Sequence, residues 1–212
     1  MKLFGYFRSS AAYRVRIALN LKGIEVEHRP VHLRRRDQDA PDYVRMNPQH
    51  LVPTLEDGGD VLIQSLAIIE YLDETHPEPP LLPADPAGRA RVRAIAQAIA
   101  CDIHPLNNLR VLKYLAGPLG IGEDAKNEWY RHWVALGFDA VESMLVTAAG
   151  TGEFCHGDAP TLADLCLVPQ VYNAERFGCD LDPYPTIRRI AGTCRRHPAF
   201  AAAAPERQPD AE

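Results

Sequence analysis

A proline-rich segment near the middle of the chain separates two halves that have different patterns. Prolines recur from Pro77 to Pro86, and proline cannot continue a helix because it lacks the backbone N–H. Before this segment short strand-like runs alternate with helical ones, whereas after it almost every stretch has helical periodicity. The sequence therefore predicts an α/β domain over residues 1–80 and an all-α domain over residues 87–212, joined by a linker.

The first half predicts a strand–helix–strand unit followed by a hairpin and a helix. The expected elements are strand Lys2–Tyr6, helix Ala11–Lys22, strand Glu25–Leu33, a shorter helix near Tyr43–Met46, strands Thr54–Glu56 and Val61–Ile63, and helix Leu66–Thr75. Gly23 is placed to end the first helix, and Gly58 and Gly59 lie in the hairpin turn. Ser65 is expected to cap the last helix. The order of elements is therefore βαβαββα.

The second half predicts helices alone. They span residues 88–115, 124–148, 161–175 and 184–196. Thr161 and Asp164 have the spacing of a capping box, and we interpret the pair as a structural device rather than as catalytic groups. From Ala201 to Glu212 the chain is rich in alanine and proline, so we expect a loose tail.

The turn between the first strand and the first helix offers hydroxyl groups where a dithiol redox protein would carry cysteines. Ser9 and Ser10 are good N-cap residues, and the helix beyond them presents the positive end of its dipole. Such a site stabilises an anion, including a thiolate. The chain has no Cys-x-x-Cys pair, so a thiol that works here must come from a ligand. The alternative is that Ser9 is only a helix cap.

Composition argues against several classes of function. The net charge is −5, and the triplet Arg34-Arg35-Arg36 is followed at once by Asp37 and Asp39, so we interpret the triplet as a solvated loop and expect no nucleic-acid partner. The five cysteines have neither disulfide nor zinc-site spacing, which favours reduced thiols and no metal. We find no leader-like or membrane-spanning apolar run, so we expect a cytoplasmic protein that does not contact a membrane.

Several motifs, taken in order, resemble the zeta class of the glutathione transferases. They are Ser9-Ser10 followed by Arg14-Val15-Arg16-Ile17-Ala18-Leu19, then Asn47-Pro48-Gln49, Leu51-Val52-Pro53-Thr54-Leu55, Gln64-Ser65, and the segment from Cys101 to Arg110. Any one piece could be chance, but their order and spacing together are specific. The resemblance covers nearly the whole chain and implies a thioredoxin-like N-terminal domain, an all-α C-terminal domain and glutathione as cofactor. Bacterial members of this class include maleylacetoacetate and maleylpyruvate isomerases.

The resemblance also assigns glutathione-binding roles. Ser9 would stabilise the thiolate, and a cis bond between Val52 and Pro53 would let Val52 pair with the cysteinyl part of glutathione. Gln64 and Ser65 would bind the γ-glutamyl carboxylate. Weaker candidates for contacts with glutathione are Gln49, His104 and Asn108.

Each of these residues also has an ordinary structural explanation. Val52-Pro53 could be a strand start, Ser65 could act only as a cap, and His104 could be a satisfied polar residue beside Pro105. The chain departs from the class at Ala11, where many members carry cysteine. Because the class assigns the thiolate to the first serine, this departure concerns only a secondary contribution.

Arginines are the candidates for binding the substrate. The resemblance implies addition of a thiolate to a cis enedioate, rotation about the resulting single bond, and expulsion of the thiolate, so carboxylates and an enolate need fixed cations. Guanidinium groups suit both. The candidates are Arg8 beside Ser9, Arg176 at the end of a helix, and Arg110, which could share a helix face with Asn107. Each could instead be a surface residue, and Arg14 and Arg16 are expected to make surface or interdomain salt bridges.

The first hypothesis is therefore a glutathione-dependent cis–trans isomerase of maleylacetoacetate, in the breakdown of aromatic amino acids. Maleylpyruvate is the runner-up substrate. A second hypothesis is a general glutathione transferase or dehalogenase that conjugates small electrophiles, and a third is a non-enzymatic interaction module. The cationic pocket argues against the second, and the retained Ser9, Gln64 and Ser65 argue against the third. The resemblance also implies a homodimer.

Overall fold

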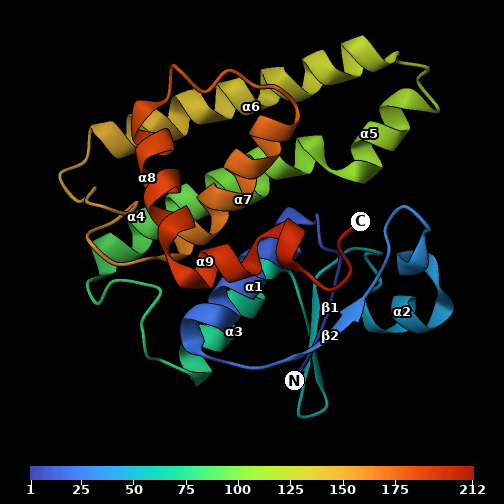
Figure 1. Cartoon of the computed structure of the whole chain (residues 1–212), viewed down its shortest axis with the longest axis horizontal. Coiled ribbons are helices and arrows are strands. Elements are labelled where there is room, and N and C mark those ends of the chain that lie inside the picture. Colours follow the sequence, from blue (N-terminus) through green and yellow to red (C-terminus); the bar gives the residue numbers. More distant parts are fainter. The chain divides into compact units, whose positions relative to one another are not determined.

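The computed structural model describes all 212 residues, which form two compact units. The first unit comprises Met1–Leu81 together with Arg196–Glu212, and the second comprises Leu82–Arg195. Figure 1 labels the nine α-helices and strands β1 and β2. Strands occur only in the first unit, and the second is helical. The expected fold class is confirmed. The expected helical domain over residues 87–212 differs from this division at its end, because the last segment packs on the first helix of the chain.

A four-stranded mixed sheet forms the centre of the first unit. Its strands are β1 (Lys2–Gly5), β2 (Glu27–Pro30), β3 (Thr54–Asp57) and β4 (Asp60–Ile63), in the order β2-β1-β3-β4. β1 runs parallel to β2 and antiparallel to β3, and β3 and β4 form the predicted hairpin. Leu3 on β1 lies opposite Leu55 on β3, and both are buried, so the middle of the sheet is apolar.

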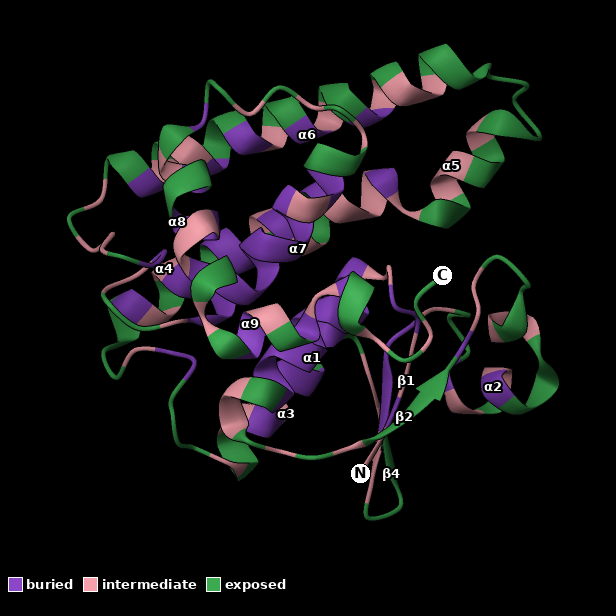
Figure 2. Ribbon diagram, in the orientation of Figure 1, coloured by how far each residue is buried: buried purple, intermediate pink, exposed green.

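Four helices belong to this unit. They are α1 (Ser10–Lys22), α2 (Pro41–Met46), α3 (Ser65–Thr75) and α9 (Pro198–Ala203). α1 packs against both α3 and α9, and it is buried along most of its length, as Figure 2 shows. As predicted, α1 ends at Gly23, whose φ of 65° is readily adopted only without a side chain.

Two local expectations in this unit are wrong. β2 spans only Glu27–Pro30 rather than Glu25–Leu33, because it is an edge strand that pairs on one side with the four residues of β1. Ser65 is the first residue of α3 and not its cap. Gln64 occupies the N-cap position, and the Ser65 hydroxyl accepts a hydrogen bond from Arg14 Nη1 at 3.2 Å.

The C-terminal tail is ordered, which contradicts the expectation of a loose segment. α9 lies along α1, where Asn20 Nδ2 donates to the Ala199 carbonyl at 2.9 Å and Phe200 is fully buried. After α9 the Gln208 side chain donates to two carbonyls of the preceding residues, at 3.0 and 2.9 Å. Small alanine side chains allow α9 to approach α1 closely. The alanine-rich composition from which we expected a loose tail is therefore also compatible with tight helix packing.

The second unit contains the remaining helices. They are α4 (Pro86–Gln97), α5 (Leu109–Ala116), α6 (Glu123–Val146), α7 (Leu162–Arg176) and α8, whose span Pro185–Arg196 ends at the unit boundary. α7 is buried on almost every face, whereas α5 has no buried residue (Figure 2). The predicted capping box is present, because the Asp164 carboxylate accepts the Thr161 N–H at 2.8 Å.

The helix expected over residues 88–115 is broken. After α4 the chain forms a π-helical stretch, Ala98–Ile103, and then a 3-10 turn, His104–Asn107, before α5 begins. Pro105 lies at this break. The helix cannot continue regularly through it, because a proline in a helix interior removes a hydrogen bond and clashes with the preceding turn. Asn108 then caps α5 by accepting the Arg110 N–H at 3.2 Å.

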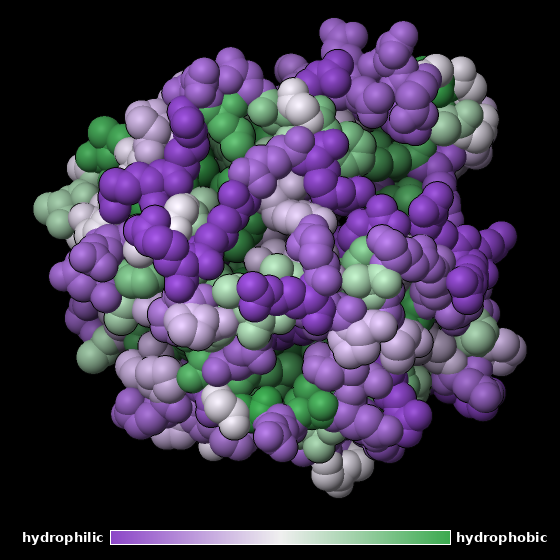
Figure 3. Space-filling view, in the orientation of Figure 1, coloured by the Kyte–Doolittle hydropathy of each residue, from purple (hydrophilic) through white to green (hydrophobic).

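None of the helices combines the length and the apolar character needed to span a bilayer. On the face drawn in Figure 3, hydrophilic residues predominate and apolar residues form separate patches.

Candidate active site

A tight turn from Tyr6 to Ser9 connects β1 to α1. The Ser9 N–H donates to the Tyr6 carbonyl at 2.9 Å, so Phe7 and Arg8 are the two central residues of a β-turn. Ser9 is the N-cap of α1, and its Oγ accepts the Ala12 N–H at 3.2 Å. The hydroxyl hydrogen remains available to donate, and Ser9 is only half-buried. This geometry is suited to donating a hydrogen bond to an anion at the positive end of α1.

Arg8 is a central residue of the same turn and is half-buried. Its Nη2 lies 3.4 Å from the Tyr6 hydroxyl, and its guanidinium carbon lies 4.7 Å from the centre of the Phe7 ring. Both contacts hold the cation near its own turn and next to Ser9. The adjacency predicted from the sequence is therefore also a spatial one.

The loop before β3 presents Val52 with a free main chain. The Val52–Pro53 bond is cis, as the resemblance implies, and Val52 makes no main-chain hydrogen bond in the protein. The Leu51 carbonyl just before it is held by the Tyr43 hydroxyl at 2.6 Å and by Asn47 Nδ2 at 2.8 Å. Burial raises the pKa of Tyr43, which keeps this phenol protonated as a donor. An extended peptide could pair with the free groups of Val52.

The roles of Tyr43 and Asn47 were not predicted. Asn47 also accepts the Gln49 N–H at 3.0 Å and donates to Thr54 Oγ1 at 3.2 Å, so one buried side chain ties the loop at three points. The motif Asn47-Pro48-Gln49 was visible in the sequence, but the spacing alone does not reveal which of its residues faces inward.

Gln49 and Gln64 meet at the start of α3. Gln64 Nε2 donates to Gln49 Oε1 at 2.6 Å, and both side chains are exposed. Gln64 has a φ of 72°, which is uncommon for a residue other than glycine and occurs preferentially at functional sites. The first N–H groups of α3 lie directly beyond it, which suits a carboxylate. Arg14 Nη1, which donates to Ser65 Oγ, adds a cation beneath this helix start.

In the second unit, His104 and Asn108 lie together. His104 Nε2 and Asn108 Nδ2 are 3.5 Å apart, and both side chains are half-buried. Arg110 is exposed on the first turn of α5. The expectation that it shares a face with Asn107 is wrong, because Asn107 belongs to the preceding turn and is buried, with its Nδ2 donating to the Tyr130 carbonyl at 3.2 Å.

Arg176 is an exposed cation on an aromatic platform. It is the last residue of α7, and its guanidinium carbon lies 5.8 Å from the Tyr172 ring centre and 5.7 Å from that of Phe177. Its Nη1 is 3.5 Å from Asn173 Oδ1. Phe177 itself stacks on Tyr130 with ring centres 3.6 Å apart. These contacts hold the guanidinium on the aromatic surface while its remaining N–H groups can bind a carboxylate.

Within the first unit the structure groups the predicted residues around two helix starts: Ser9 and Arg8 at α1, and Gln49, Gln64 and Ser65 at α3. Arg14 and Arg16 are both buried, so the surface alternative expected for them is wrong. A charged side chain is usually exposed to solvent, so the sequence favours a surface position for both arginines. Their burial follows from the packing of α1, which the sequence pattern does not show.

Three of the five free cysteines lie in surroundings that make them poor nucleophiles. Burial raises the pKa of Cys155, Cys179 and Cys194, so these thiols remain protonated. Cys179 lines an apolar cavity of about 390 Å³ in the second unit, together with Arg131 and Tyr184. All five cysteines belong to the second unit, so the first unit has no thiol of its own to place at the Ser9 turn.

Comparison with known proteins agrees with these observations. Residues 3–80 match the family described as glutathione S-transferase, N-terminal domain. The chain is 56% identical over 211 residues to a probable maleylacetoacetate isomerase of Vibrio cholerae, covering 99% of this chain and 97% of that one. A holo maleylpyruvate isomerase structure, described as a bacterial zeta-class glutathione S-transferase, has a TM-score of 0.98 at 50% identity, with both chains covered completely. A maleylacetoacetate isomerase from Methylobacterium extorquens, solved with malonate and glutathione, has a TM-score of 0.97 at 46% identity, again with full coverage of both chains.

Proposed function

The chain belongs to the zeta class of the glutathione transferases, and we propose that it is a glutathione-dependent isomerase that converts maleylacetoacetate to fumarylacetoacetate. The observation that carries this proposal is the Ser9 hydroxyl at the N-terminus of α1, in a unit that contains no cysteine. The assignment agrees with the relatives of this chain, which are isomerases of maleyl compounds. It places the enzyme in the breakdown of aromatic amino acids.

The residues of the first unit fit glutathione. Val52 offers a free N–H and C=O to the cysteinyl part, and the start of α3 with Gln64, Gln49 and Ser65 offers donors to the γ-glutamyl carboxylate. When bound, glutathione supplies a thiolate that adds reversibly to the double bond and is not consumed. Ser9 would hold that sulfur in its ionised form. A fall of two units in the thiol pKa needs about 2.7 kcal/mol, which one hydrogen bond to a charged acceptor and a helix end can supply.

Arg8, Arg110 and Arg176 are the proposed substrate-binding groups. All three guanidinium groups are exposed or half-buried, so they can reach a ligand. They would neutralise the carboxylates of the substrate and the negative charge that develops next to the reacting bond. We also propose His104 and Asn108 as contacts with glutathione on the basis of family membership, and their two polar side chains lie next to each other. A conjugating transferase with broad specificity would instead be expected to bind its electrophilic substrates in an apolar site.

Maleylpyruvate is the alternative substrate, because it shares the cis double bond and both flanking polar groups with maleylacetoacetate. The relatives include isomerases of each compound. We further propose a cytoplasmic homodimer. The five free cysteines suit a reducing compartment, and the dimer rests on family membership alone.

A direct assay tests the reaction and ranks the substrates. The purified protein is mixed with maleylacetoacetate or maleylpyruvate, with and without glutathione, while cis-to-trans conversion and free thiol are followed together. We expect rapid conversion that requires glutathione and leaves its concentration unchanged, faster with maleylacetoacetate. Thiol consumed in proportion to product would indicate a conjugating transferase, and no turnover with either compound would indicate a binding role.

A further inference from the structure

Two peptide planes determine how the Tyr6–Ser9 turn presents its side chains. The first joins Tyr6 to Phe7, and the second joins Phe7 to Arg8. Rotation of either plane changes the backbone dihedrals of the central residues, and with them the directions of Arg8 and Ser9. The Ser9 N–H fixes only one atom of the first plane, the Tyr6 carbonyl oxygen.

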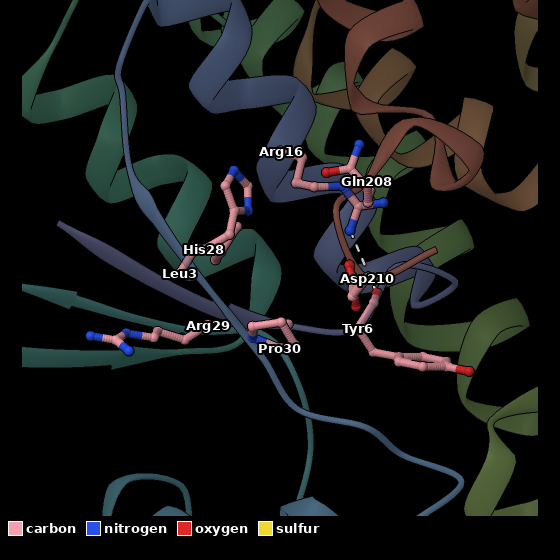
Figure 4. Close-up of a pocket in the computed structure, with 9 residues that line it drawn as sticks. Leu3, Tyr6, Arg16, His28, Arg29, Pro30, Gln208 and Asp210 are labelled. Carbon is pink, nitrogen blue, oxygen red and sulfur yellow. Dashed lines mark hydrogen bonds between the residues drawn. The ribbon is translucent and has the colours of Figure 1, made fainter. Parts of the chain in front are cut away.

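Arg16 binds both planes from beneath. Its Nη2 donates to the Phe7 carbonyl at 2.9 Å, and its Nη1 lies 3.5 Å from the Tyr6 carbonyl, the dashed contact in Figure 4. Its Nε donates to the Ala203 carbonyl at 3.1 Å, at the end of α9. Arg16 is only 4% exposed, and its guanidinium carbon also lies 5.3 Å from the centre of the Tyr13 ring, so this charged group is enclosed by protein rather than by solvent.

Asp210 binds the first plane from the opposite side of the same peptide. Its Oδ2 accepts the Phe7 N–H at 3.0 Å, across more than two hundred residues of sequence. Arg16, Asp210 and Gln208 line a cavity of about 20 Å³ beside β1, and Figure 4 shows them converging on it while the Tyr6 ring points away. The first peptide plane is thus held at its C=O by Arg16 and Ser9 and at its N–H by Asp210.

The tail that carries Asp210 is itself anchored. Gln208 donates to the carbonyls of Ala202 and Ala204, and the last residue, Glu212, contacts His32 Nε2 at 2.6 Å. The His32 hydrogen bond lowers the pKa of Glu212, which favours its charged form. Asp210 therefore reaches the turn from a segment fixed on both sides.

We propose that Arg16 and Asp210 are positioning residues that clamp the Tyr6–Ser9 turn, so that the C-terminal tail holds the Ser9 hydroxyl in its thiolate-binding orientation. The clamp binds neither glutathione nor substrate, and it acts through the main chain of Phe7. This inference rests on the proposed function of Ser9 and extends it to a segment at the other end of the sequence. A charge-assisted hydrogen bond is shorter and stronger than a neutral one, which suits a clamp that must resist rotation.

The test compares Asp210→Ala with Asp210→Asn. In each purified variant the thiol pKa of bound glutathione is read from thiolate absorbance, and kcat and KM are measured in the isomerase assay. Because small displacements at a reacting centre have large rate effects, we expect Asp210→Ala to lower kcat about tenfold and to raise the bound thiol pKa, with little change in KM. Asp210→Asn keeps an acceptor for the Phe7 N–H and should recover most of both losses.

Asp42→Asn is the matched control, since Asp42 is an exposed carboxylate of the same unit that pairs with Arg45 and contacts neither the turn nor the tail. We expect it to leave the thiol pKa of bound glutathione and kcat unchanged. If Asp42→Asn reproduces the effects of Asp210→Ala, or if Asp210→Ala lowers only thermal stability, the clamp is refuted. If Asp210→Ala does not fold, the test rests on Asp210→Asn. A thiol pKa and a kcat close to the wild-type values would then support an acceptor role for residue 210, and a tenfold loss of kcat would refute it. A wild-type protein that does not lower the thiol pKa would instead contradict the proposed function itself.

Discussion

At the scale of single residues, Ser9 combines a structural and a chemical role. Its oxygen caps α1 by accepting the Ala12 N–H, while its hydroxyl hydrogen can donate. The sequence alone could predict the cap and suggest the donor, because both depend on neighbours along the chain. It could not predict that the Arg16 side chain binds carbonyl groups of the same turn. The three carbonyl partners of Arg16 come from separate parts of the chain and are brought together only by folding.

Ser9→Ala should lower kcat by about 10- to 100-fold, since a hydrogen bond to a charged acceptor contributes about 1.5–3 kcal/mol. Loss of the cap should also lower stability by about 1 kcal/mol. Steady-state kinetics and urea denaturation separate the two effects. Ser9→Thr keeps both the hydroxyl and the cap and should remain active. Near-normal turnover of Ser9→Ala would mean that Ser10 or the helix dipole stabilises the thiolate.

Arg176→Ala should raise the KM for the maleyl substrate about tenfold or more, and the KM for glutathione much less, because the proposal gives Arg176 a substrate carboxylate only. Arg188→Ala is the matched control, since Arg188 is an exposed arginine of the same unit that pairs with Asp182 at 2.8 Å. Equal effects on both constants would remove Arg176 from the substrate site.

At the scale of elements, α7 is the most deeply buried helix of the second unit, and its start depends on Asp164. One carboxylate oxygen accepts the Thr161 N–H and the other accepts the Cys155 N–H, each at 2.8 Å. Burial raises the pKa of Asp164, while these hydrogen bonds oppose that rise. The capping-box spacing predicted the first contact, but not the second, which ties α7 to a separate loop.

Thr161→Ala should lower the free energy of unfolding by about 1 kcal/mol, the usual loss for an N-cap. Asp164→Ala should lower it by about 3 kcal/mol or more, because it leaves two buried N–H groups without an acceptor. Urea denaturation measures both, with Asp180→Ala on an exposed carboxylate as the control. Equal losses for the two variants would show that the link to Cys155 contributes nothing.

At the scale of the whole molecule, glutathione should stabilise the fold by binding only the native state. At one hundred times its dissociation constant the gain is about 2.7 kcal/mol, which for a chain of this size raises Tm by about 5–10 °C. A thermal melt with and without glutathione measures the shift. Oxidised glutathione, which has no free thiol, is the control that shows how much of the Tm shift depends on the thiol group. An unchanged Tm at saturating concentration would contradict the proposed binding site.

The proposed homodimer should sediment as a single species of twice the chain mass of 23.5 kDa. Analytical ultracentrifugation at the concentration of the activity assay measures this. A species with the mass of one chain would overturn the proposal and would leave the isomerase assignment intact, since every contact described at the Tyr6–Ser9 turn lies within one chain.

The sequence by itself determined the alternation of elements before residue 80, the helical second half, the Ser9 cap and the Thr161 capping box. These features depend on periodicity, turns and caps, which are written within a few consecutive residues. Only the tertiary structure decided that Arg16 is buried, that the tail is ordered and that Asp210 reaches Phe7. Contacts between residues far apart in the chain leave no local pattern, and the energy that selects them comes from packing the whole unit.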